Sequence, residues 1–158
     1  MPGTNTSANA SDIMFVQMMI PHHSQAIEMS DYAKTNTTNP VVLALAAKIS
    51  AAQQPEIDLM GNWLHQWGIH DMHEMDMNMS DDGMLSDSQM ATLKAATGKE
   101  FDKLYLTGMI AHHQGAVAMA QEVLVDGQNS RVHELATNIV ESQTSEIAQM
   151  QEMVAAVS

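Results

Sequence analysis

The sequence contains no cysteine, which excludes a disulfide framework, a thiolate zinc site and a thiol redox centre. Any soft-metal chemistry must therefore use thioether sulfur and imidazole nitrogen. Aromatic residues make up only 4% of the chain, and methionine supplies much of the missing bulk. The 16 Met residues are about a tenth of the 158 residues. Because Met packs well but specifies a core loosely, packing alone does not explain this excess.

Basic residues are also scarce, at 6 against 19 acidic residues, and the formal net charge is −13. This balance argues against nucleic acid and anionic membrane surfaces as partners, and it suits a protein that attracts cations. No apolar run approaches the roughly 20 residues of a membrane-spanning helix, so we expect no membrane insertion. Residues 1–7 resemble a mature terminus or an added start, which is compatible with a removed signal peptide.

The length fits one domain, which we place at 11–158 after a disordered polar tail at 1–10. Helical periodicity and capping residues predict helices at 12–34, 40–67, 86–96, 97–125 and 130 to near the C-terminus. The expected caps are Ser11, Asn39 before Pro40, and capping boxes that begin at Ser86 and Thr97. Pro21 and Pro55 fall inside helices and predict bends there. The segment 69–85 is predicted to be a loop.

The sequence contains an internal duplication with an offset of 90 residues. Of the 49 residues from 12 to 60, 16 are identical to the residue 90 positions later, with no gap. Chance would give about one identity in sixteen. Two duplicated helical hairpins predict an all-α, ferritin-like four-helix bundle. Its parts are repeat one at 12–67, a Met/His-rich crossover at 68–98 and repeat two at 99–157.

The most distinctive repeated stretch is Met-x-x-His-His followed, after five residues, by a second Met. On a helix these side chains lie on overlapping faces, so each copy offers two imidazoles and two thioethers together. Methionine at helical spacing is usually core, and a single histidine there is usually structural. Two copies at fixed spacing favour metal binding instead. The predicted ligands are Met19, His22, His23 and Met29, and Met109, His112, His113 and Met119.

The residue three positions before each histidine indicates which kind of metal the motif would bind. Di-iron and di-manganese bundles use Glu-x-x-His on paired helices, and this chain contains no Glu-x-x-His. Met19 and Met109 stand three residues before His22 and His112. Thioether with imidazole favours Cu(I), and by the same softness Ag(I), over Fe, Mn or Mg. A site without thiols also suits an oxidising compartment, because thioether is not consumed as disulfide.

The crossover loop carries a second candidate set. Methionine alternates there with histidine among acidic residues, and a flexible strand of this kind can wrap a soft ion. The alternative is a solvated acidic linker, but repeated exposed Met gains nothing in solubility and invites oxidation. The candidate ligands in the loop are His70, Met72, His73, Met75, Met77 and Met79.

Gln53 and Glu56 recur as Gln143 and Glu146 on the second helix of each hairpin. They are candidates to accept hydrogen bonds from the motif imidazoles, which would fix their tautomer and orientation. The alternative is a buried polar network that joins the two hairpins, and the sequence leaves both readings open.

The residues from about 12 to 157 resemble the domain-of-unknown-function family that includes CopM-type copper-binding proteins. The resemblance rests on the duplicated motif, on the Thr97–Lys103 entry to the third long helix and on Trp67-Gly68. It implies a ferritin-like four-helix bundle, a periplasmic or otherwise extracytoplasmic location, and binding of Cu(I) or Ag(I) in copper tolerance. The family motif falls on the two sets of four residues named above.

The sequence therefore predicts a protein that sequesters Cu(I), and Ag(I), without catalysis, and hands it to a copper efflux or chaperone protein. Two alternatives remain. A di-metal ferritin-like oxidoreductase would need bridging carboxylates, for which Glu56 and Glu146 are the only duplicated pair. A structural or partner-binding bundle would use its methionines only as an adaptable core.

Overall fold

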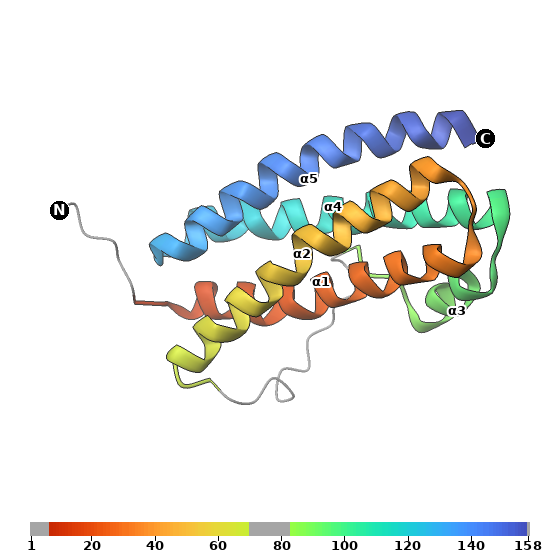
Figure 1. The fold of residues 1–158 in the computed structure, drawn as a ribbon. Coiled ribbons are helices and arrows are strands. Elements are labelled where there is room, and N and C mark those ends of the chain that lie inside the picture. The colour runs from red at the N-terminus through yellow and green to blue at the C-terminus, as the bar shows by residue number, and fades with distance from the viewer. Residues whose placement is uncertain (1–6, 70–82, 158) are drawn as a thin grey trace.

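The computed structural model describes residues 7–69 and 83–157, and these form five helices and no strand (Figure 1). The helices are α1 (Ala10–Asn36), α2 (Pro40–Gln66), α3 (Asp87–Ala95), α4 (Gly98–Asp126) and α5 (Ser130–Val157). Four are long and α3 is short, as the sequence predicts. The bounds differ from the predicted ones by one or two residues, and α1 begins inside the tail predicted at 1–10.

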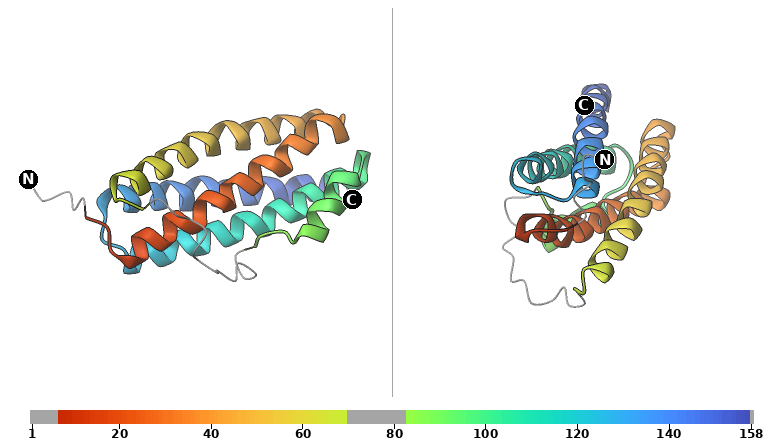
Figure 2. Two further views of the ribbon diagram at one scale, coloured as in Figure 1. Left: turned by 90° about the horizontal axis from the view of Figure 1, so that it is seen from below. Right: turned by 90° about the vertical axis from the view of Figure 1, so that its left-hand side faces the viewer.

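The four long helices pack as two hairpins. α1 packs on α2, α4 packs on α5, and α1 and α4 join the hairpins side by side (Figure 2). α3 lies against α1 and α4, outside the four-helix array. This arrangement confirms an all-α four-helix bundle built from two duplicated hairpins.

Two of the four predicted N-terminal helix caps are present in the structure, and two are not. Asn39 accepts a hydrogen bond from the backbone N–H of Val41, and Ser86 forms its capping box with Gln89. The cap of α1 is Asn9 rather than Ser11. Thr97 makes no side-chain cap bond, so the capping box predicted there is wrong. Asn9 caps α1 because its side-chain oxygen accepts a hydrogen bond from the backbone N–H of Asp12, the third helical residue, as a capping box requires.

The prolines do not interrupt the helices in which they lie. α1 continues through Pro21 and α2 through Pro55. Each proline removes one backbone donor, which neighbouring turns tolerate in a helix held by tertiary packing. No helix in the described part of the chain is both long enough and apolar enough to cross a bilayer.

Two buried carboxylates form hydrogen bonds between the two hairpins. Asp12 of α1 accepts hydrogen bonds from the backbone N–H groups of Gln128 and Asn129 at the turn before α5, at 3.0 Å each from Oδ2. In the duplicated position, Asp102 of α4 accepts from the Thr37 hydroxyl at 2.6 Å, at the turn before α2. The two ends of the bundle are thus fixed by equivalent contacts, and the middle of α1 is held opposite the middle of α4.

Candidate metal centre

The four motif histidines meet in the middle of the bundle. His22 and His23 lie halfway along α1, and His112 and His113 lie halfway along α4. Each exposes 1% or less of its surface. The rings of His22 and His112 touch, with centroids 3.7 Å apart and planes tilted by 38°. The duplication therefore brings one imidazole of each copy into direct contact.

The second histidine of each motif turns toward its own hairpin partner. His23 Nε2 lies 2.7 Å from Glu56 Oε1 on α2, and His113 Nε2 lies 3.0 Å from Glu146 Oε1 on α5. An ionised carboxylate can only accept a hydrogen bond, so the ring proton of each histidine sits on Nε2. The two glutamates thus accept hydrogen bonds from motif imidazoles, as the duplication suggested. The amide oxygen of Gln53 is buried without a hydrogen-bond partner in the described part of the chain.

Three imidazole nitrogens in this layer are buried with no hydrogen-bond partner among residues 7–69 and 83–157. They are His23 Nδ1, His112 Nε2 and His113 Nδ1. A buried polar atom without a partner costs about 1–3 kcal/mol, and such atoms are uncommon in folded proteins. On neutral His23 and His113 the orphaned Nδ1 carries the free lone pair, since the ring proton sits on Nε2 and is donated to the glutamate. A neutral nitrogen with a free lone pair is what a metal ion needs from histidine.

Burial also favours the neutral form of His112. Its pKa is lowered well below the ordinary 6.5, first by desolvation and then by repulsion from His22, His113 and His23. The imidazole therefore stays unprotonated at neutral pH. A metal ion that binds His112 would not have to displace a proton from it.

The motif methionines are all in the interior, but they are divided between two apolar clusters. Met29 and Met109 belong to one cluster. Met19 and Met119 belong to the other. Three of them are fully buried, and Met119 is 8% exposed. Each half of the core thus presents two thioethers, one from α1 and one from α4.

The structure does not bring every predicted ligand together. Among residues 7–69 and 83–157, no three His, Cys, Asp or Glu side chains are close enough to share an ion. The lack of such a group among the described residues disfavours a carboxylate-bridged di-metal site. The loop candidates His70, Met72, His73, Met75, Met77 and Met79 lie outside the described residues.

Two further methionines, Met14 and Met18, line a pocket beside Met119 and were not among the predicted ligands. Their i, i+4 spacing on the first helix was the signal that could have found them.

Comparison with known proteins places the chain in a family. The sequence model of the domain of unknown function DUF305 matches residues 12–154. The chain belongs to the DUF305 family.

Solved DUF305 structures share this bundle along nearly its whole length. A DUF305 protein from Streptomyces coelicolor, inferred to be secreted, is 33% identical and superimposes with a TM-score of 0.87, over 93% of this chain and 92% of its own. CopM in its Cu(I)-bound form is 30% identical with a TM-score of 0.79, over 92% of this chain and 96% of its own. CopM is also known in Ag-bound and Cu(II)-bound forms.

A shorter sequence match is to the uncharacterized protein L153 of Acanthamoeba polyphaga mimivirus. It is 43% identical over 49 residues, which are 31% of this chain. The match spans about a third of the viral protein, at 32% of its length.

Proposed function

We propose that this DUF305 protein binds Cu(I), and Ag(I) in the same way, through the histidines and methionines of its duplicated motif. In this proposal it acts as a sink or carrier that lowers free copper in an extracytoplasmic compartment, without catalytic turnover. An efflux or chaperone protein would receive the metal.

The observation that carries the proposal is the set of orphaned nitrogens on His23, His112 and His113. A bundle that used these histidines only for structure would pair them with donors or acceptors, as it pairs Asp12 and Asp102. The lone pairs of His23 Nδ1 and His113 Nδ1 remain available instead, in a layer flanked on both sides by thioethers. Binding an ion would satisfy atoms that otherwise cost stability.

The donor set fits a soft monovalent ion. Imidazole with thioether favours Cu(I) over hard divalent ions, and the described residues bring no trio of His and carboxylate side chains together. The metal-bound forms of CopM, a relative at 30–31% identity, support the same class of ion. The net charge of −13 would attract any cation to the surface.

The test is a titration of the reduced protein with Cu(I) against a chromogenic Cu(I) chelator. His22→Leu with His112→Leu removes the touching pair and should weaken the tightest Cu(I) equivalent by at least about tenfold, the lower end of what losing an outer-sphere partner costs. His65→Gln, on the exposed last turn of α2, is the matched control and should compete as the unaltered chain does.

Circular dichroism of the double variant keeps loss of binding separate from loss of fold. A folded double variant that competes for Cu(I) as strongly as the unaltered chain would contradict the proposal. A chain altered only at the six loop candidates provides the second arm. If that change alone abolished competition, the bundle motif would not be the copper site.

A further inference from the structure

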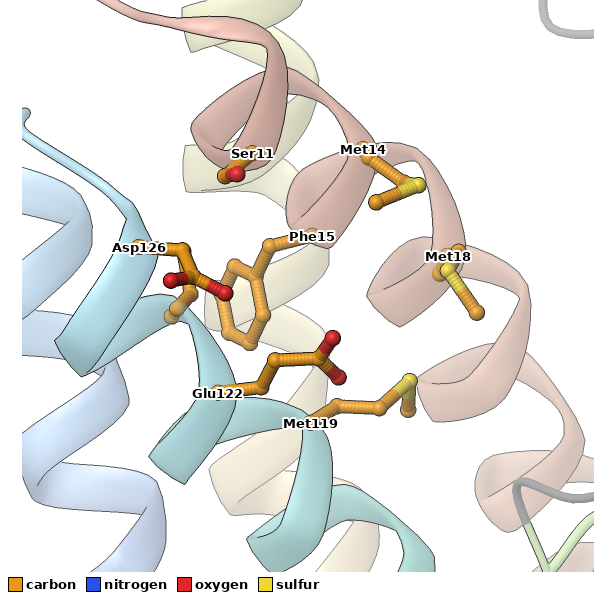
Figure 3. Close-up of a pocket in the computed structure, with 8 residues that line it drawn as sticks. Ser11, Met14, Phe15, Met18, Met119, Glu122 and Asp126 are labelled. Atoms are coloured by element: carbon orange, nitrogen blue, oxygen red, sulfur yellow. The ribbon is translucent and has the colours of Figure 1, made fainter.

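A pocket of about 70 Å³ lies between α1 and α4, close to the N-terminus of α1, and no histidine of the described residues lines it (Figure 3). Three thioethers line it, from Met14 and Met18 on α1 and Met119 on α4. The carboxylates of Glu122 and Asp126 line the same pocket. Figure 3 shows Met119 and Glu122 extending from α4 toward α1, with Met14 and Met18 lying along α1.

The duplication allows this pocket between α1 and α4 to be compared with the equivalent positions at the other end of the same two helices. The equivalent of Met119 is Met29, and the equivalent of Met18 is Gly108. A side chain added at Gly108 would come within 3.4–3.5 Å of Met29 and Leu85. At the equivalent end of the α1/α4 groove, Leu85 from the segment before α3 packs against Gly108, and the pocket that Leu104 and Gly108 line includes residues of that segment and of α3.

Two hydrogen bonds hold Leu85 in place over that end of the α1/α4 groove. The Gln25 side chain donates to the Leu85 carbonyl at 3.0 Å and accepts from its N–H at 2.8 Å. The equivalent of Gln25 in repeat two is Gly115, which has no side chain to hold a cover. At the uncovered end the sequence instead has Met14 and Met18, where repeat two has Leu104 and Gly108.

The pocket is accessible from outside, unlike the histidine layer. Met14 is 40% exposed, Met119 is 8% exposed, and Phe15 and Val123 are buried beneath them. Within the described residues, neither Glu122 nor Asp126 forms an ion pair. Two uncompensated carboxylates beside three thioethers make the site attractive to a cation.

We propose that Met14, Met18 and Met119 form a second binding site for a soft monovalent cation, Cu(I) or Ag(I), independent of the histidine layer. Three thioether sulfurs supply ligands of the softness that Cu(I) prefers. Glu122 compensates the charge of the ion from the rim. The volume suits an ion with a water rather than an organic ligand, since a water takes about 30 Å³ and drug-sized ligands need about 300 Å³ or more.

This site rests on the soft-metal preference of the proposed function and shares Met119 with its motif, but it uses none of its histidines and adds Met14 and Met18. The two can therefore fail separately. The pocket would load first from solution, because an ion reaches it without opening the core.

The experiment uses the full chain with ¹³C-labelled methionine methyl groups, titrated with Ag(I), which is stable to oxidation. Each methyl resonance is identified by single Met→Leu variants. We expect the methyl signals of Met14, Met18 and Met119 to shift together, also in the chain that carries His22→Leu and His112→Leu. Met14→Leu with Met18→Leu should lose one equivalent of Ag(I) retained after gel filtration.

Met150→Leu with Met153→Leu, on the buried face of α5, is the matched control and should lose no equivalent. If the motif methyls of Met19, Met29 and Met109 shift while those of Met14 and Met18 do not, the second site is wrong and the proposed function stands. Equal losses from the pocket and control variants would also overturn the site. If no methyl in the chain shifts, both proposals fail.

Discussion

The two histidines of each motif have different neighbours, although they are adjacent in sequence. His22 and His112 contact each other across α1 and α4. His23 and His113 each contact a glutamate within their own hairpin. One hundred degrees of helical rotation between adjacent residues explains the difference. The first histidine of each motif therefore contacts the other repeat, and the second is oriented by a glutamate of its own repeat.

Glu146→Gln tests the orienting role of the carboxylate on α5. The amide keeps the size of the side chain but no longer holds the proton of His113 at Nε2 as a charged acceptor does. We expect Cu(I) affinity to fall about 10- to 100-fold, the usual cost of losing a partner behind a metal-binding histidine. Competition against a Cu(I) chelator measures it.

Glu141→Gln is the matched control, because Glu141 is exposed on the same helix. Equal affinities for the Glu146 and Glu141 variants would mean that the His113–Glu146 contact is only structural.

The pKa of His112 predicts how stability depends on pH. Because this pKa is lowered in the folded chain, the unfolded chain binds the extra proton first as pH falls below about 6.5. The contribution of His112 to the free energy of unfolding is therefore fully present above that pH. It is lost toward lower pH, by at most about 1.4 kcal/mol per pH unit for one proton. Urea unfolding of the metal-free chain at several values between pH 7.5 and 5 measures the slope.

His112→Leu should make that slope shallower, whereas the exposed control His65→Gln should leave it as it is. An unchanged slope in the His112 variant would show that this histidine is protonated equally in the folded and unfolded chains.

The His–Glu pairing is one of two readings that the sequence leaves open, suggested by the recurrence of both partners at the same offset, and the structure shows the contacts. The contact between His22 and His112 could not be predicted, because it depends on the register of α1 against α4. That register is set by Asp12 and Asp102, whose partners lie 116–117 and 65 residues away in the chain. No local pattern in the sequence encodes such distances.

At the scale of helices, the two aspartates hold each hairpin against the start of a helix in the other. Asp12 is fully buried and accepts hydrogen bonds from two backbone N–H groups at the turn before α5, one of which is shared between its two carboxylate oxygens. A carboxylate near a helix N-terminus also interacts favourably with the helix dipole. These contacts orient α1 and α4 so that the histidines of the two repeats meet.

Asp12→Ala should destabilise the bundle by about 1.5–3 kcal/mol or more, because charge-assisted bonds are lost and buried backbone donors are left unpaired. Asp31→Ala is the control. Its carboxylate forms only an exposed pair with Lys34, worth about 0–1 kcal/mol. Denaturant unfolding of both variants measures the difference, and equal losses would show that the Asp12 contacts do not hold the hairpins.

Helix number and most helix bounds could be predicted from periodicity and capping residues. The errors are at caps, where Asn9, Ser11 and Thr97 are all plausible by residue type. Which of them caps a helix depends on the backbone angles that the packed chain imposes, and these are not visible in composition. The position of α3 across the α1/α4 groove depends on the Gln25–Leu85 contact, which joins residues 60 apart.

At the scale of the whole molecule, the bundle is a duplicated hairpin whose halves are not identical. The histidine layer lies between two apolar clusters, one in each half of the bundle. One end of the α1/α4 groove is covered by α3 and the segment before it (Figure 1). The other end remains open and is lined with methionine. Duplication thus accounts for the shared centre, and divergence accounts for the two different ends.

The most direct test of the central claim is a crystal structure of the Cu(I)-loaded chain with anomalous data collected at the copper edge. We predict an anomalous peak within bonding distance of an imidazole nitrogen of the His22, His23, His112 and His113 layer and of a motif thioether. Copper found only at sites that touch none of these four histidines would contradict the account.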